Sequence, residues 1–189
     1  MLFINDLKNC YLLDHYSQSS EKLSFKKVAK KLVADWPYKS VVEYRLWKFL
    51  LSKRTTKWIG SFLRIRYIKK YCIDIHPDAI IGEGLKFAHP FNIVIGAGVV
   101  IGNNACIYNG VTLGAKNRAN LELNINSDSR YPIVGNNVTI FTGAKLLGPI
   151  VIGERCIIGA NSVVMESVPD DSICVGIPGR VYNSSNYDN

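Results

Sequence analysis

Apolar residues recur every six positions through most of the chain after residue 73, and this period restricts the possible fold more than any other feature. It matches neither the 3.6-residue period of an amphipathic helix nor the two-residue period of a strand. A six-residue unit cannot bury its own apolar face, so successive units must stack on one another. The recurring apolar positions are Ile75, Ile81, Phe87, Ile95, Ile101, Ile107, Leu113, Val134, Ile140, Leu146, Ile152, Ile158 and Val164.

Each hexad is expected to form one short strand and one turn, with three hexads to a triangular coil. Glycine often follows the apolar residue, and Gly and Asn supply turn conformations that other residues avoid. We therefore predict a mainly β fold, a left-handed parallel β-helix preceded by a small α-helical N-terminal region. Small or β-branched residues expected inside the coil corners are Val99, Ala105, Val111, Val138, Ala144, Cys156 and Ser162.

Two interruptions break the six-residue period. From Ile81 to Ile95 the spacing is 14 residues, and from Leu113 to Val134 it is 21. The first break contains His89, and the second is a polar segment expected to leave the prism as a loop. Irregularities in an otherwise consistent pattern are where functional sites are expected.

The N-terminal third has helical rather than hexad spacing. Residues 24–36 carry one apolar stripe, and Pro37 is expected to end that helix. Ser40 and Glu43 fit a capping box at the start of a second helix. A third helix is expected within 55–71, with Trp58, Phe62 and Ile65 or Tyr67 facing inward. The predicted division is a helical region over 1–72, a β-helix over 73–182 and a tail over 183–189.

Charge is distributed unevenly between the two parts of the chain. Residues 1–73 hold 16 Lys and Arg against 5 Asp and Glu, whereas the rest holds 7 against 10. This asymmetry suggests peripheral contact with an anionic membrane or an acidic glycan, although a basic solvated helix face is equally compatible. No nucleic-acid-binding motif accompanies the charge, so no nucleic-acid partner is expected. The basic residues of the third helix are Lys57, Arg64, Arg66, Lys69 and Lys70.

The sequence carries no pattern of export or membrane insertion. It begins without a secretory leader, and no apolar stretch approaches the ~20 residues that span a bilayer. Its five cysteines are widely spaced and lack a CxxC pair, which favours reduced thiols over disulfides or a zinc site. We expect a cytoplasmic protein, at most peripheral at the inner membrane face, with no bound metal.

Three stretches resemble the serine acetyltransferase family and its relatives that O-acetylate bacterial polysaccharides. They are Asp74 to His89 (DIHPDAIIGEGLKFAH), Ile93 to Ala115 and the closing segment Val163 to Val181. Hexapeptide β-helices serve several functions, so these motifs, rather than the fold, carry the functional expectation. The resemblance implies acetyl-CoA as co-substrate and a homotrimer whose active sites lie between neighbouring subunits.

The resemblance assigns His89 as general base and Asp74 as the residue that orients and stabilises its imidazole ring. A hydroxyl is a weak nucleophile near neutral pH, and histidine titrates in the range needed to activate it. His76 also matches a family position, with a structural role. The positions matching the family's cofactor site are Gly114, Ala115, Thr142, Gly143, Ala160 and Arg180.

Departures from the family lie in the acceptor pocket. Ala88 stands where serine acetyltransferases have an Asp that contacts serine, and Tyr131 replaces a His in the segment Ser129-Arg130-Tyr131-Pro132, which keeps the Arg. With Ala88, Arg130 and Tyr131 as the acceptor-binding residues, a sugar hydroxyl of a bacterial capsule or surface polysaccharide is the expected acceptor.

Other functions compete with that expectation. The runner-up is serine O-acetylation in cysteine biosynthesis, and acetylation of another small hydroxyl compound such as an antibiotic follows it. A β-helix carbonic anhydrase needs three zinc-binding histidines, but only His76 and His89 lie in the repeat region. A catalytically inactive scaffold or glycan-binding module is the remaining alternative.

Overall fold

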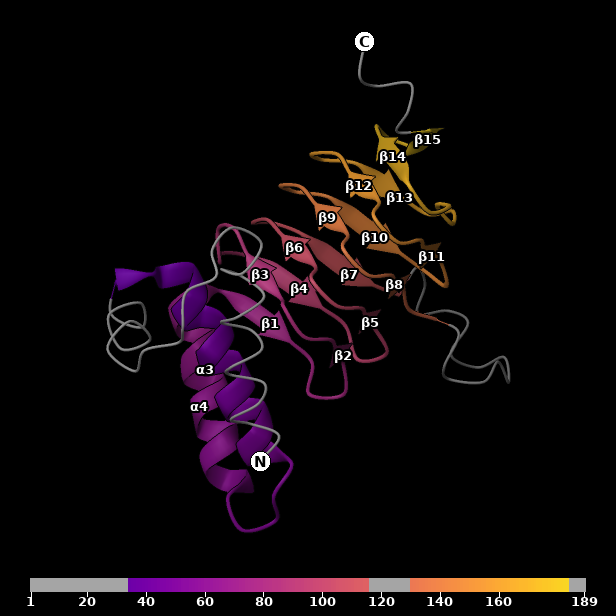
Figure 1. Cartoon of the computed structure of the whole chain (residues 1–189). Helices are drawn as coiled ribbons and strands as arrows, with labels where there is room; N and C mark the ends of the chain where they lie inside the picture. The colour runs from indigo at the N-terminus through magenta and orange to yellow at the C-terminus, as the bar shows by residue number, and fades with distance from the viewer. Residues whose placement is uncertain (1–33, 116–129, 184–189) are drawn as a thin grey trace, which may run out of the picture.

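A computed structural model describes residues 34–115 and 130–183 as a three-sided parallel β-helix capped by two helices (Figure 1). The predicted mainly β, left-handed parallel β-helix is confirmed. Sheet 1 contains β1 (Ile73–Ile75), β4 (Ile93–Ile95), β7 (Thr112–Gly114), β10 (Lys145–Leu147) and β13 (Val163–Val164). Sheet 2 contains β2 (Ile80–Ile81), β5 (Val100–Ile101), β8 (Ile133–Val134) and β11 (Val151–Ile152). Sheet 3 contains β3 (Lys86–Phe87), β6 (Cys106–Ile107), β9 (Thr139–Ile140), β12 (Ile157–Ile158), β14 (Ser172–Val175) and β15 (Arg180–Asn183).

The hexad register accounts for the core. Ile81 pairs with Ile101, which pairs with Val134, so equivalent apolar residues of successive coils stack in a column. The predicted corner residues are also buried, and Ala105, Val138 and Cys156 are fully so. At the last coil β15 pairs antiparallel with β14, which ends the otherwise parallel stacking.

Turns between sheets form the three edges of the prism. The His89 edge contains the turns from sheet 3 to sheet 1, at 88–92, 108–111, 141–144 and 159–162. The Tyr131 edge contains the turns from sheet 1 to sheet 2, at 76–79, 96–99, 115, 130–132 and 148–150. The asparagine edge contains the turns from sheet 2 to sheet 3, at 82–85, 102–105, 135–138, 153–156 and 169–171.

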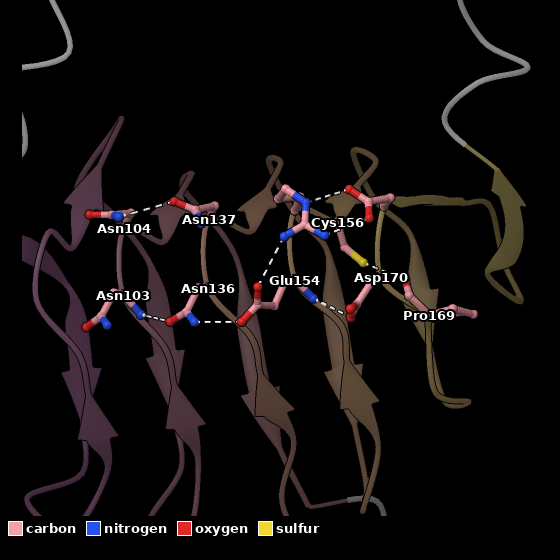
Figure 2. Close-up of polar contacts among 10 residues, drawn as sticks. Asn103, Asn104, Asn136, Asn137, Glu154, Cys156, Pro169 and Asp170 are labelled. Atoms are coloured by element: carbon pink, nitrogen blue, oxygen red, sulfur yellow. Dashed lines mark hydrogen bonds and ion pairs between the residues drawn. The ribbon is translucent and has the colours of Figure 1, made fainter.

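Side chains on the asparagine edge form a ladder that binds one coil to the next (Figure 2). Asn136 Oδ1 accepts a bond of 2.7 Å from the Asn103 backbone N–H, and Asn136 Nδ2 donates one of 2.7 Å to Glu154. Asp170 accepts from the backbone N–H of Glu154 at 2.8 Å. Because these turns have no neighbouring strand on their outer side, the ladder satisfies backbone donors that the sheets leave unpaired.

Two helices, α3 (Trp36–Leu51) and α4 (Lys57–Tyr71), precede the first coil. The predicted capping box is wrong: the side chain of Asp35 caps α3 by accepting from the Tyr38 N–H at 2.9 Å, whereas Ser40 lies inside the helix. Pro37 likewise stands in the first turn of α3 rather than ending a helix, a position where its missing N–H costs nothing. The rest of the predicted helix at 24–36 lies outside the described residues, as does the loop at 116–129.

Helix α4 buries a different face from the predicted one. Its buried residues are Gly60, Tyr67 and Tyr71, so of the predicted inward residues only Tyr67 is correct. Gly60 explains the orientation, since a side-chain carbon there would lie 2.7 Å from the backbone nitrogen of Leu51 in α3. Close approach of the two helices therefore uses the glycine face. The predicted inward residues that are instead exposed are Trp58, Phe62 and Ile65.

The helices cover the N-terminal end of the prism (Figure 1). Tyr44, Trp47 and Tyr71 belong to the same apolar cluster as the first coils. Arg45 of α3 donates to the carbonyl of Ile81 at 2.8 Å. Among the described residues, no helix combines the length and apolar character needed to cross a membrane.

Candidate active site

His89 stands at the first turn of the His89 edge, with its side chain exposed. The turn is rigidly built: Pro90 is buried, and Asn92 adopts a φ of 55° that lets the chain re-enter sheet 1. The backbone carbonyl of Phe91 accepts from the N–H of Gly110 at 3.0 Å, which ties this turn to the one below it. The 14-residue interruption therefore presents a histidine to solvent from a fixed backbone.

Four predicted cofactor residues follow His89 along the same edge. Thr142 and Gly143 lie in its third turn and Ala160 in its fourth. Arg180 begins β15 directly after the turn that follows β14, and it is exposed. With a strand spacing of about 4.8 Å, these four coil steps span roughly 19 Å. The edge thus offers an extended track with a histidine at one end and a cation at the other.

The remaining two cofactor residues, Gly114 and Ala115, lie on a different edge. Gly114 ends β7 where sheet 1 turns towards sheet 2, so it belongs to the Tyr131 edge. A side-chain carbon on Gly114 would meet nothing closer than Leu147 Cδ2 at 4.0 Å. The coil does not need glycine there, unlike Gly143, whose φ is 74° and whose added carbon would lie 2.1 Å from Asn161 Oδ1. The absence of a side chain at Gly114 leaves clear surface for a ligand.

Asp74, the predicted partner of His89, is held by a different residue. Its Oδ1 accepts a charge-assisted bond of 2.6 Å from Arg64 of α4. The expected hydrogen bond between Asp74 and His89 is not formed in the described part of the chain. Asp74 nevertheless lies on the coil directly above Val94 of β4, the strand that the chain enters just after His89.

The predicted acceptor residues divide between two edges. Ala88 precedes His89, whereas Arg130 and Tyr131 lie on the Tyr131 edge. The Tyr131 ring packs against the coil: carbons added to Gly96 and Gly98 would lie 2.6 Å and 2.5 Å from ring atoms. One subunit therefore does not bring Tyr131 beside His89.

Two aromatic residues beside His89 were missed by the sequence analysis. The Tyr108 ring lies edge-on to His89 with centroids 6.0 Å apart, and Phe141 lies 4.8 Å from Tyr108. Both rings are half-buried and occupy the hexad position where glycine stands in most other turns. That exchange of glycine for a large side chain in two successive turns is the pattern that identifies them.

His76 has a structural environment, since its Nδ1 accepts from the backbone N–H of Asp78 at 3.2 Å. Within residues 34–115 and 130–183 there is no group of three or more His, Cys, Asp or Glu side chains able to hold a metal ion. Three of the cysteines described there are free thiols: Cys156 and Cys174 are buried, and Cys72 is exposed.

Comparison with known proteins gives consistent matches. A family model described as "Bacterial transferase hexapeptide (six repeats)" matches residues 131–165. The chain is 45% identical over 109 residues to the serine acetyltransferase of Synechococcus elongatus, covering 58% of this chain and 42% of that one. It is 36% identical over 138 residues to the serine acetyltransferase of Buchnera aphidicola, covering 73% and 50%. The chain thus spans about half the length of these curated relatives.

Solved structures agree over nearly the whole chain. A serine acetyltransferase in complex with cysteine superposes with a TM-score of 0.77 at 30% identity, over 96% of this chain and 70% of that one. A serine acetyltransferase in complex with CoA superposes with a TM-score of 0.73 at 30% identity, over 95% and 69%.

Proposed function

The chain belongs to the serine acetyltransferase-like family of hexapeptide-repeat acyltransferases, and on that premise we propose that it transfers an acetyl group from acetyl-CoA to a hydroxyl acceptor. The observation that carries the proposal is the His89 edge, where an exposed histidine begins a row of turns that passes the small residues Thr142, Gly143 and Ala160 and ends near Arg180. A general base at one end of an elongated edge and a cation at the other suit a long thioester co-substrate.

His89 performs the proton chemistry. Its neutral ring nitrogen accepts the proton of the acceptor hydroxyl as that oxygen attacks the acetyl carbonyl. Asp74 stabilises the positive charge that the ring acquires. His89 then returns the proton to the departing sulfur. Acetyl-CoA supplies the activated acetyl group as a thioester.

The proposed cofactor residues have distinct tasks. Thr142, Gly143 and Ala160 have small side chains or none, so a ligand can approach the backbone of these turns. Arg180 offers a cation for the phosphate end of the co-substrate. Gly114 and Ala115 supply a second clear surface from the Tyr131 edge.

Free L-serine is the leading acceptor. The relatives found by comparison are serine acetyltransferases, and this supports serine better than the polysaccharide acceptor expected from the sequence. A carbohydrate hydroxyl remains a second candidate on one specific observation. Ala88 provides no charge beside His89 for an ammonium group, while the half-buried rings of Tyr108 and Phe141 offer an apolar surface suited to the C–H face of a sugar.

Both acceptors are tested by measuring thiol release from acetyl-CoA. The measurement compares kcat/KM for L-serine with kcat/KM for a panel of sugars and oligosaccharides. Turnover of L-serine at ~10⁴ M⁻¹s⁻¹ or better supports the leading candidate. Turnover of sugars with poor use of serine supports the second. A protein that releases no thiol with any hydroxyl acceptor contradicts acetyl transfer itself.

We also propose a homotrimer with shared sites. The predicted site residues lie on two different edges of one prism, so a complete site needs the His89 edge of one subunit and the Tyr131 edge of another. The outward face of sheet 2 supports such packing, since its paired residues Ile80, Val100, Ile133 and Val151 are all aliphatic.

A further inference from the structure

The side chain of Arg64 links the helical cap to the acidic residue of the proposed catalytic pair. Its Nη2 donates to Asp74 Oδ1 at 2.6 Å, and its Nε donates to the backbone carbonyl of Ile75 at 3.3 Å. The guanidinium also lies over the ring of Trp47, 5.9 Å from its centroid, and Trp47 is itself buried. The position of the Arg64 head group is therefore fixed from three directions.

Only one carboxylate oxygen of Asp74 is used by this contact. A carboxylate has two oxygens and about four acceptor positions, so Oδ2 remains able to accept a ring N–H. The bond to Oδ1 restricts rotation of the carboxylate. A fixed orientation is the property that a partner of a protonated imidazole needs.

We propose that Arg64 is a positioning residue, which orients the Asp74 carboxylate so that Oδ2 receives the N–H of His89 when the acceptor binds. This inference rests on the proposed acetyl transfer and adds to it a residue of the helical cap. Residues that orient metal ligands commonly contribute 10–100-fold to activity, and we expect an effect at the lower end of that range for a residue that orients a catalytic carboxylate.

A purely stabilising role for the Arg64–Asp74 pair is the alternative. Asp74 has 54% of its side chain exposed and Arg64 has 26%, and ion pairs that exposed contribute little to stability. The chain offers a matched control on the same helix. Lys70 also has 26% of its side chain exposed, donates to the carboxylate of Glu43 at 2.6 Å and lies over aromatic rings, but it does not touch Asp74.

The test measures kcat, KM and the thermal midpoint for Arg64→Met, Arg64→Lys, Lys70→Met, Asp74→Asn and the double variant Arg64→Met/Asp74→Asn. Arg64→Met is expected to lower kcat roughly tenfold with an unchanged KM for acetyl-CoA. Arg64→Lys is expected to recover part of the loss, because an ammonium can donate to Oδ1 but lacks the second arm that reaches Ile75. Lys70→Met is expected to keep the wild-type kcat. In the Asp74→Asn background, Arg64→Met is expected to have no further effect on kcat, since its action passes through that carboxylate.

Three outcomes overturn the inference. The first is an unchanged kcat for Arg64→Met, whether or not its thermal midpoint falls. The second is an equal loss of kcat in the presence and absence of Asp74, and the third is a gain of kcat, which would mean that Arg64 withholds Asp74 from His89. The proposed function is tested separately, because wild-type thiol release and its loss in His89→Ala do not involve Arg64.

Discussion

A single exposed imidazole carries the proposed proton transfer, and the fold does not depend on it. His89 makes a ring contact with Tyr108, but its turn is held by backbone bonds and by buried Pro90. His89→Ala is therefore expected to lower kcat by roughly 10²–10⁴ while leaving acetyl-CoA binding and the thermal midpoint unchanged. Steady-state kinetics and calorimetric titration with CoA measure these effects. Near-wild-type turnover by His89→Ala would mean that another group acts as the base.

Substitutions at two glycines, Gly114 and Gly135, distinguish a role in ligand binding from a role in coil packing. A side-chain carbon at Gly114 would make only an ordinary contact, 4.0 Å from Leu147 Cδ2, whereas one at Gly135 would lie 2.9 Å from backbone atoms of the next turn. Gly114→Leu is expected to raise KM for acetyl-CoA roughly tenfold or more with no loss of stability. Gly135→Ala is expected to destabilise the fold by about 1–3 kcal/mol with little effect on KM. Urea unfolding and kinetics on both variants check this, and a Gly114→Leu enzyme with normal KM removes Gly114 from the cofactor site.

Among the elements, the asparagine edge shows how turns are held from coil to coil. Asn136 stands in the middle of its ladder, accepting from the Asn103 backbone and donating to Glu154. Asn136→Ala removes the acceptor of the exposed Asn103 N–H and the donor to Glu154, and we expect a loss of about 0.5–1.5 kcal/mol in the free energy of unfolding. Thr139→Ala, in the following strand, is the control, because Thr139 makes no side-chain hydrogen bond to any described residue. Equal unfolding midpoints for the two variants would assign the ladder no role in stability.

The β-helix was predictable element by element because the hexad constrains both faces of every strand. A residue such as Ile101 must be apolar, a corner residue such as Ala105 must be small, and a slip of one residue would expose both. The helices lacked such a constraint. Helix α4 has aromatic residues on both faces, and only the contact of Gly60 with α3 selects the Tyr67 face as the buried one.

The sequence predicts site positions that the six-residue repeat fixes, but not contacts between residues that are distant in the chain. The 18-residue spacing from Thr142 to Ala160 is one complete coil, so counting hexads assigns these two residues to the same edge. The second break in the period lies between His89 and Thr142, so counting alone could not assign His89 to that edge. The bond between Arg64 and Asp74 leaves no trace in the sequence, since it joins a helix to a strand across a left-handed turn at Cys72. The packing of Tyr131 on Gly96 was equally hidden, because those two residues meet across the second break in the period.

At the scale of the whole molecule, the location of the site residues on two edges of the prism bears on how the subunits assemble. His89 and Gly114 belong to different edges of the same prism, and in the proposed trimer a thioester contacts the His89 edge of one subunit and the Tyr131 edge of its neighbour. Ile133 and Val151 are exposed and adjacent on sheet 2, next to the Tyr131 edge. Burial of such an aliphatic column against another copy brings that edge to a neighbour, and a closed ring of such head-to-tail contacts gives a cyclic trimer.

Mixing two defective subunits tests this arrangement directly. His89→Ala damages the His89 edge and leaves Gly114 intact, whereas Gly114→Leu does the reverse, so neither homotrimer has a complete site. In a mixed trimer, some sites combine the intact His89 edge of one subunit with the intact Tyr131 edge of its neighbour. A trimer that contains both variants has one such site among its three, so the mixed trimers are expected to reach roughly a third of wild-type kcat/KM for acetyl-CoA.

Differently tagged subunits purified through both tags, with the trimer mass checked by light scattering, provide the sample. Separately purified variants combined without subunit exchange are the control and are expected to stay at the low activity of their average. If each prism contained a complete site, the mixed trimers would show that same average. Recovery above it requires that the base and the clear surface at Gly114 reach one ligand from two subunits, which is the geometry inferred from the two edges.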